Sequence, residues 1–318
     1  MTSLDVLLLG GTGTIGRATA RALVAAGHRV TALLRPAATA DLPGCTLLRA
    51  EATDPASLAA AVTQACPQAV VSCLASRTGA SQDAWAIDHR ANSAALAAAR
   101  AAGVETFVLL SAICVQRPKL AFQHAKLAFE AELQAAPIRW TIVRPTAFFK
   151  SLSGQVTRVR DGRSFLVFGD GRLTACKPIS DTDLGRFLAQ CLTDPAAANR
   201  ILPIGGPGPA ITPLDQAAML ERLLGRPVRI RHVPVAMMTA IIGLLSTLGT
   251  IAPRLRDKAE LARIGRYYAT ESMLAWNPAT NRHDAEATPE FGTDRLEDHY
   301  AALLRGEVTD DRGAHAVF

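Results

Sequence analysis

Three regularly spaced glycines near the start of the chain could bind an anion. Gly10, Gly13 and Gly16 come directly after the apolar run 5–9, DVLLL. Small residues allow a tight turn from a strand into a helix and let the backbone approach a diphosphate closely. The free N–H groups and the dipole at the start of a helix favour the negative charge. The spacing therefore predicts a diphosphate-binding turn formed by Gly10, Thr12, Gly13, Thr14, Ile15 and Gly16.

Arginines follow where a nucleotide ribose would lie. A dinucleotide with free ribose hydroxyls usually meets an acidic residue at the end of the second strand. This chain has Arg35 at that position and Arg17 inside the first helix. A guanidinium matches the shape and charge of a 2′-phosphate. We therefore expect NADPH as the cofactor, with Glu51 on the adenine side and with Pro145 and Thr146 completing the cofactor set.

A serine and a lysine stand at positions suited to redox chemistry. The domain resembles the short-chain dehydrogenase/reductase superfamily, in which a serine ends the fifth strand and Tyr-x-x-x-Lys follows on the next helix. Ser111 and Lys126 match this pattern, whereas Phe122 replaces the tyrosine. Phenylalanine cannot protonate a carbonyl oxygen, so ketone or alcohol chemistry is disfavoured. The resemblance implies that Lys126 holds the nicotinamide ribose, and Ser111 is a second catalytic candidate.

The elements that must position these residues alternate along the first half of the chain. Apolar runs predict strands at 5–9, 28–34, 45–50, 69–75, 106–112 and 140–145, with helices between them. One of these helices is expected over 85–102. We predict an α/β fold with a Rossmann-type doubly wound parallel sheet over residues 1–146. After Pro145 the alternation stops, which predicts a smaller mixed α/β C-terminal substrate lobe over 147–318.

Composition limits the classes of function. The chain has 318 residues, a formal net charge of +6 and 49% hydrophobic residues, which is typical of a globular protein. Its arginines are scattered, so no nucleic-acid partner is expected. Six cysteines without a CxxC pair predict no metal site and a reducing, cytoplasmic location. The first residues lead straight into a strand, so we expect no targeting peptide.

One uncharged stretch, 233–252 (VPVAMMTAIIGLLSTLGTIA), approaches the length of a membrane-spanning helix. Hydroxyls and glycines within it, and prolines on both sides, favour a helix buried in the chain or in an oligomer interface. The basic run 254–266 follows directly, so contact with the surface of the inner membrane through 233–266 stays open. An oligomer stays open as well.

Long strings in the second half of the chain allow a closer comparison. The chain resembles the ferredoxin-independent divinyl chlorophyllide a 8-vinyl-reductases in 111–133 (SAICVQRPKLAFQHAKLAFEAEL), 143–156 (VRPTAFFKSLSGQV), 168–184 (FGDGRLTACKPISDTDL), 202–216 (LPIGGPGPAITPLDQ) and 264–274 (IGRYYATESML). Glu51 stands where the family tends to have aspartate. The resemblance implies NADPH, no flavin or metal, and reduction of the 8-vinyl group of a divinyl chlorophyllide or protochlorophyllide.

This reaction agrees with the missing tyrosine. A vinyl group conjugated to the macrocycle accepts hydride and then a proton on carbon, so no alkoxide forms. The sequence leaves the proton donor open among Lys126, Tyr267, Tyr268, Cys114 and solvent. Tyr267 joins Lys126 and Ser111 as a catalytic candidate.

The pigment needs an apolar slot and a cation for its propionate. Phe148, Phe149 and Lys150 follow the sixth strand at its carboxyl end, where ligands of such sheets bind. We expect these three residues and Tyr268 to bind the pigment. Further candidates carry weaker arguments: Lys177 and Arg266 for the propionate, and His124 for the magnesium.

Two other classes of function stay open. The first is an NADP(H)-binding sensor or assembly protein without turnover. The second is an isomerase, or a reductase that acts on an imine or alkene in an unrelated small substrate.

Overall fold

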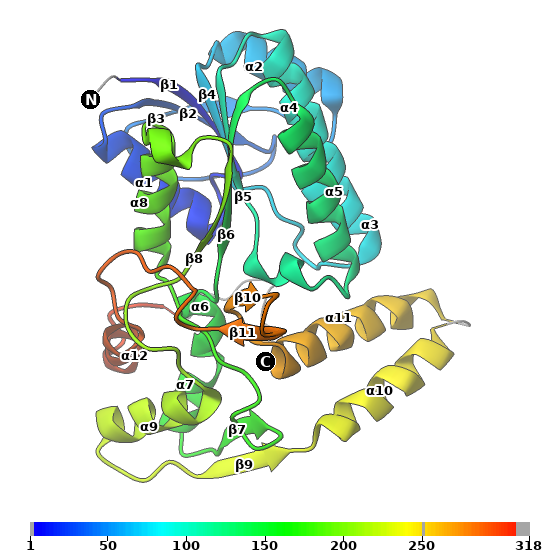
Figure 1. Cartoon of the computed structure of the whole chain (residues 1–318), viewed down its shortest axis with the longest axis vertical. Coiled ribbons are helices and arrows are strands. Elements are labelled where there is room, and N and C mark those ends of the chain that lie inside the picture. The colour runs from blue at the N-terminus through cyan, green and yellow to red at the C-terminus, as the bar shows by residue number, and fades with distance from the viewer. Residues whose placement is uncertain (1–2, 250–251, 310–318) are drawn as a thin grey trace. The chain divides into compact units, whose positions relative to one another are not determined.

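A seven-stranded, all-parallel sheet dominates the computed structural model, which describes residues 3–249 and 252–309 (Figure 1). The strand order is β3-β2-β1-β4-β5-β6-β8. The strands are β1 (Asp5–Leu9), β2 (Arg29–Leu34), β3 (Cys45–Arg49), β4 (Ala69–Ser72), β5 (Thr106–Leu110), β6 (Arg139–Pro145) and β8 (Arg200–Ile204). The order reverses between β1 and β4, and sheets of this kind bind ligands beyond the carboxyl ends of their strands at that point.

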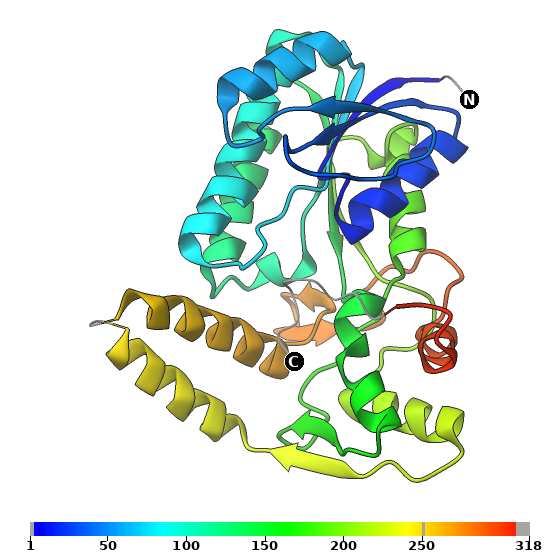
Figure 2. The same ribbon diagram turned by 180° about the vertical axis from the view of Figure 1, so that it is seen from behind.

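Helices cover both faces of this sheet, as Figures 1 and 2 show. Helices α1 (Thr14–Ala25) and α8 (Asp181–Cys191) cover one face, and α2 (Pro55–Ala65), α4 (Asn92–Ala101) and α5 (Ala121–Ala135) cover the other. Every residue of β4 and β5 is buried, because these central strands have helices on both faces. The predicted doubly wound α/β fold is confirmed.

The chain forms two compact units, and the first is discontinuous. Unit 1 comprises Met1–Ser76, Ser81–Pro145 and Asp181–Ile204; unit 2 comprises Arg77–Ala80, Thr146–Ser180 and Gly205–Phe318. The single boundary predicted after residue 146 therefore does not account for the segment Asp181–Ile204. This segment returns to unit 1 because β8 pairs with β6 and α8 packs on α1.

The packing of α8 on α1 is close enough to require a glycine. A Cβ atom at Gly185 would lie 2.7 Å from the carbonyl carbon of Ala18.

The strand β8 was not among the predicted strands. It lies at the sheet edge and is only partly buried over most of its length, and Pro203 stands among its apolar residues, which argues against a central strand.

The helix predicted over 85–102 is interrupted. The structure has a short α-helix, α3 (Ser81–Ala84), then a π-helical segment η1 (Trp85–Ala91), and then α4. A π-helical turn widens the helix by one residue and is rare, which is why a periodicity argument does not find it.

Unit 2 contains the mixed α/β elements that the sequence predicts. A parallel pair, β7 (Phe165–Phe168) with β9 (Ile230–Val233), and a hairpin, β10 (Ala275–Asn277) with β11 (Arg282–Asp284), form two small sheets. Its helices are α6 (Phe149–Leu152), α7 (Val156–Arg160), α9 (Pro213–Leu224), α10 (Val235–Leu248), α11 (Pro253–Thr270) and α12 (Leu296–Arg305).

The prediction that the apolar helix near residue 240 is buried within the chain is wrong. Helix α10 has no buried residue, although one of its sides packs along α11 (Figure 2). Four large apolar side chains on the opposite side are 43–62% exposed: Met237, Ile241, Leu244 and Leu248. No helix within the described residues is both long and apolar enough to span a bilayer. The end of the predicted helix, at 250–251, lies outside those residues.

Candidate cofactor and catalytic site

The glycine turn follows β1 and begins α1 in unit 1. Gly10 has a φ of +76°, and a Cβ there would lie 2.5 Å from the carbonyl oxygen of Cys73. A Cβ at Gly16 would collide with the carbonyl oxygen of Gly10. Both positions therefore exclude any side chain for reasons of folding alone.

Gly13 differs from the other two glycines, because it faces open space. It is exposed, and the nearest atom to a Cβ built there is the Gly10 oxygen at 3.5 Å. Gly13 is also the N-cap of α1, so no side chain caps the helix start. Exposed backbone at an uncapped helix start is what a diphosphate requires, so the residues present fit a dinucleotide. Thr12 lies in the same turn, and Thr14 and Ile15 are the first two residues of α1.

The two arginines of the predicted cofactor set have different environments. The Arg17 Nε donates to the carbonyl oxygen of Thr12 at 3.0 Å, so this side chain is folded against the glycine turn. Arg35 directly follows β2 and is exposed. Its loop is held by Arg49, which donates from Nη1 to the carbonyl oxygens of Pro36 and Ala38 at 2.5 and 2.9 Å.

Glu51 lies just after β3 and is part of the local loop structure. Its carboxylate accepts hydrogen bonds from the backbone N–H and the hydroxyl of Thr53, and its own N–H donates to the Ser57 hydroxyl. These contacts fix the loop beside the carboxyl ends of β2 and β3.

Lys126 is held in a buried ion pair that the sequence did not indicate. Its Nζ lies 2.9 Å from Oδ1 of Asp88, and the two side chains are 12% and 0% exposed. Burial raises the pKa of the Cys73 thiol to about 12, and the Thr19 hydroxyl and the nearby Lys126 ammonium oppose this rise. Since the Cys73 carbonyl contacts the Gly10 position, Lys126 reaches the same edge of the sheet as the glycine turn.

The Ser111 hydroxyl donates a hydrogen bond to a buried carboxylate. The Ser111 Oγ lies 2.5 Å from Oε1 of Glu130, and Glu130 also forms an ion pair with Arg144. Phe122, which replaces the superfamily tyrosine, is buried. The Ser111 hydroxyl therefore belongs to a network that joins β5, α5 and β6.

The residues at the end of β6 are buried. Pro145 is the last residue of this strand, and Thr146 follows it. The Thr146 hydroxyl donates a hydrogen bond to the Lys177 carbonyl oxygen. Lys177 is buried in unit 2, and its Nζ lies 2.6 Å from Oε1 of Glu290. The Glu290 carboxylate therefore already balances the charge of Lys177, which the sequence offered as a propionate candidate.

The predicted pigment residues of unit 2 differ in exposure. Phe149 is 3% exposed and packs 5.6 Å from the His299 ring, which makes it a core residue of this unit. Phe148 and Lys150 are half-buried. Tyr267 is buried, whereas Tyr268, whose ring is perpendicular to that of Tyr267 at 5.8 Å, is 41% exposed.

The remaining candidates are dispersed. His124 and Arg266 are exposed, and Cys114 is buried. Within residues 3–249 and 252–309, no cluster of three or more His, Cys, Asp or Glu could hold a metal ion.

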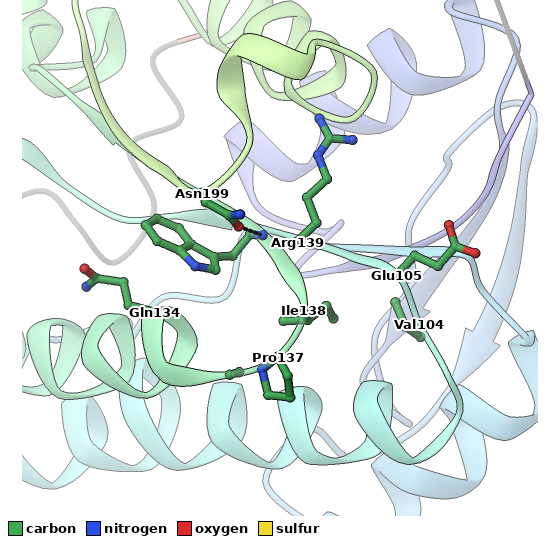
Figure 3. A pocket seen from close by; sticks show the side chains of 9 residues that line it. Val104, Glu105, Gln134, Pro137, Ile138, Arg139 and Asn199 are labelled. Carbon is green, nitrogen blue, oxygen red and sulfur yellow. Dashed lines mark hydrogen bonds between the residues drawn. The ribbon is translucent and has the colours of Figure 1, made fainter.

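One hollow lies at the amino ends of the strands, at the opposite end of the sheet from the glycine turn (Figure 3). It is lined around the amino ends of β5 and β6, where the Trp140 N–H donates to the side chain of Asn199 at 3.1 Å. Arg139 in its lining is bound to carbonyl oxygens after α8. The glycine turn lies at the carboxyl ends of the strands, so this hollow is not part of the cofactor site.

Comparisons with known proteins agree with this geometry. A family model described as NAD(P)H-binding matches residues 10–195. The divinyl chlorophyllide a 8-vinyl-reductase of Oryza sativa subsp. indica is 46% identical, with 98% of this chain and 82% of that protein covered. The photosystem II assembly factor Ycf39 of a Synechocystis strain is 27% identical over 74% of this chain and 72% of its own.

A solved structure shows the same fold. An NADPH-dependent quinone oxidoreductase from Escherichia coli, determined with NADPH, superimposes with a TM-score of 0.68 at 16% identity. The match covers 94% of this chain and 99% of the oxidoreductase.

Proposed function

Because the chain belongs to the family of divinyl chlorophyllide a 8-vinyl-reductases, we propose that it uses NADPH to reduce the 8-vinyl group of a 3,8-divinyl chlorophyllide or protochlorophyllide to an ethyl group. The observation that carries this proposal is the 46% sequence identity to the Oryza sativa reductase across 98% of the chain, which includes both units. The buried Phe122 is consistent with a reaction that needs no acid beside a carbonyl oxygen.

The decisive experiment is anaerobic incubation of the purified protein with NADPH and 3,8-divinyl chlorophyllide a. Absorption of the Soret band and chromatographic retention distinguish the divinyl from the monovinyl pigment. NADPH-dependent conversion without ferredoxin or flavin is the expected result. Tight NADPH binding without conversion would contradict the proposal and favour a non-catalytic NADP(H)-binding protein.

Unit 1 supplies the groups that would hold the cofactor. NADPH, when bound, supplies the hydride for the reduction. The glycine turn would bind its diphosphate, and Arg17 and Arg35 add positive charge beside that turn and after β2. Lys126 would donate hydrogen bonds to the nicotinamide ribose from the ammonium that Asp88 holds. Glu51 and Pro145 of unit 1 and Thr146, with which unit 2 resumes, complete the proposed set.

The preference for NADPH is expected to depend on Arg35. The variant Arg35→Glu places a carboxylate where the 2′-phosphate would bind, so NADPH affinity should fall by about 100-fold while NADH affinity stays within about threefold. Fluorescence titration of both cofactors measures this. Arg49→Lys is a useful companion, because it keeps the charge but weakens the support of the same loop. Equal loss of NADPH and NADH affinity in Arg35→Glu would assign Arg35 to structure instead of selectivity.

For the pigment, we propose contacts from unit 2. Phe148 and Tyr268 offer partly exposed aromatic surface, and Lys150 offers a cation for the propionate. Phe149 would support Phe148 from within the core. We further propose Tyr267 as the proton donor to carbon, and Ser111 as a group that orients α5 through Glu130.

We also propose that α10 contacts an anionic membrane surface. Helix α10 has an exposed apolar stripe (Met237, Ile241, Leu244 and Leu248), and the elements before and after it in the chain, β9 and α11, contain basic residues. The exposed basic residues include Arg229, Arg231, Arg256, Lys258 and Arg266. A helix that inserts apolar side chains beside such cations suits a surface of anionic lipid.

Sedimentation with vesicles tests this contact. The protein should sediment with vesicles rich in phosphatidylglycerol at low salt and be released at high salt. Leu244→Glu should abolish sedimentation, because a carboxylate in the centre of the stripe opposes both insertion and the anionic surface. Glu286→Gln, a surface change outside α10, serves as the control. Failure of the unaltered protein to sediment at either salt concentration would overturn the proposal.

A further inference from the structure

The π-helical segment η1 places one carboxylate against the proposed catalytic lysine. Asp88 lies in this segment, its side chain is 0% exposed, and its Oδ1 lies 2.9 Å from the Lys126 Nζ. The same Oδ1 accepts a hydrogen bond from the Ser76 N–H at 3.3 Å. The other oxygen, Oδ2, is buried and has no hydrogen-bond partner among the described residues. A buried carboxylate oxygen without a partner is costly, and such groups need an explanation.

The backbone of η1 is fastened to the sheet by a second buried side chain. Asn92 donates from Nδ2 to the carbonyl oxygens of Ile87 and Asp88, both at 3.2 Å. Its Oδ1 accepts the hydroxyl proton of Ser72, at the end of β4, at 2.6 Å. The carbonyl oxygens of the widened turn are thereby satisfied, and the turn is fixed to the strand that ends beside the glycine turn.

From this arrangement we infer that Asp88 is a positioning residue for Lys126, and that Asn92 and Ser72 fix the turn that carries it. The inference rests on the proposed function, in which Lys126 holds the nicotinamide ribose. A lysine side chain has four rotatable bonds and a compact charge, so without a partner its ammonium is not confined to one place. Asp88 confines it, and the charge of the buried pair is balanced before cofactor binds. The two remaining N–H donors of the ammonium are left to meet the ribose.

The test is a double-mutant cycle on NADPH affinity, and turnover of the pigment is a second, separate readout. Asp88→Asn keeps the shape of the side chain and removes its charge. We expect its NADPH dissociation constant to rise, and kcat to fall, by about 10-fold to 100-fold, the scale seen when groups that orient metal-ligating side chains are removed. The KM for the pigment should change by less than about twofold. In a Lys126→Met background, Asp88→Asn should weaken NADPH binding by less than about twofold, because the lysine through which it acts is absent.

If Asp88→Asn raises the NADPH dissociation constant by the same factor in the presence and in the absence of Lys126, the inference is overturned, because Asp88 then affects binding independently of the lysine. Asp5→Asn is the matched control: it makes the same change in the ion pair with Arg29, at the amino edge of the sheet, and should leave NADPH affinity unchanged. Should Asp88→Asn not fold, Ser72→Ala carries the same test through the loss of one hydrogen bond, with an expected rise of about threefold to tenfold in the dissociation constant. If the protein with its native sequence binds NADPH but does not reduce the vinyl group, the cycle still decides the inference while the proposed function fails.

Discussion

Lys126→Met is expected to lower NADPH affinity by about 100-fold and to reduce turnover by at least as much. The variant removes the ammonium that Asp88 holds near the carboxyl ends of the strands, and with it the hydrogen-bond donors proposed for the cofactor. It also leaves the fully buried Asp88 carboxylate without its cation, and the loss of one member of a buried ion pair typically costs about 3–5 kcal/mol of folding free energy. Fluorescence titration with NADPH and thermal unfolding measure the two effects separately.

A second substitution separates these two losses. Adding Asp88→Asn to Lys126→Met removes the uncompensated charge, so the melting temperature should recover while NADPH affinity stays low. Lys119→Met, an exposed lysine close to the start of α5, should change neither quantity. Full affinity and turnover in Lys126→Met would remove this residue from both the binding and the catalytic role.

The glycine turn gives the second large effect, and here two similar substitutions should differ in kind. Gly16→Ala places a methyl group against the Gly10 carbonyl oxygen, so the turn itself must shift. We expect loss of measurable NADPH binding together with a melting temperature lower by several degrees, in line with a destabilisation of about 1–3 kcal/mol.

Gly13→Ala should weaken NADPH binding with little effect on the fold. Its methyl group meets nothing closer than 3.5 Å, and Gly13 is the N-cap of α1, where alanine is somewhat less favourable than glycine, so the melting temperature should fall by only about a degree or two. The added methyl group nevertheless lies over the backbone that a diphosphate would approach, and affinity should fall by about tenfold or more. Equal thermal stability of the two variants would show that the turn at Gly16 tolerates a side chain.

The sequence was most informative where local pattern and burial agree. The strands around β1 are short apolar runs that end at turn residues, and all six strands predicted in the first half of the chain are present. The glycine turn was predictable for the same reason, since spacing, a preceding strand and a following helix coincide. The strand β8 was missed because it contains Pro203, and a proline argues against a strand unless the strand lies at an edge of the sheet.

Other features depend on contacts between distant segments, which periodicity does not report. In the sequence, Asp88 is a single acidic residue within a predicted helix. The ion pair with Lys126 forms only because the π-helical segment places Asp88 against α5. Ser111 was expected at the reaction centre, yet its hydroxyl is bonded to Glu130, a residue 19 positions further along the chain. The apolar composition of α10 indicated burial, but composition does not say whether a helix finds apolar neighbours within its own chain.

The return of Asp181–Ile204 to the sheet has a consequence for biosynthesis. The ribosome synthesises the chain from its amino end, so β1 to β6 leave the ribosome well before α8 and the edge strand β8, which complete the sheet and its helical layer. Until then one side of β6 stays unpaired, and the α1 surface that receives Gly185 stays open to water. Unpaired edges of this kind are exposed to aggregation while synthesis continues. Nascent fragments that end before residue 181 should therefore depend on chaperones, and the dinucleotide fold should become self-sufficient only after residue 204 has left the exit tunnel.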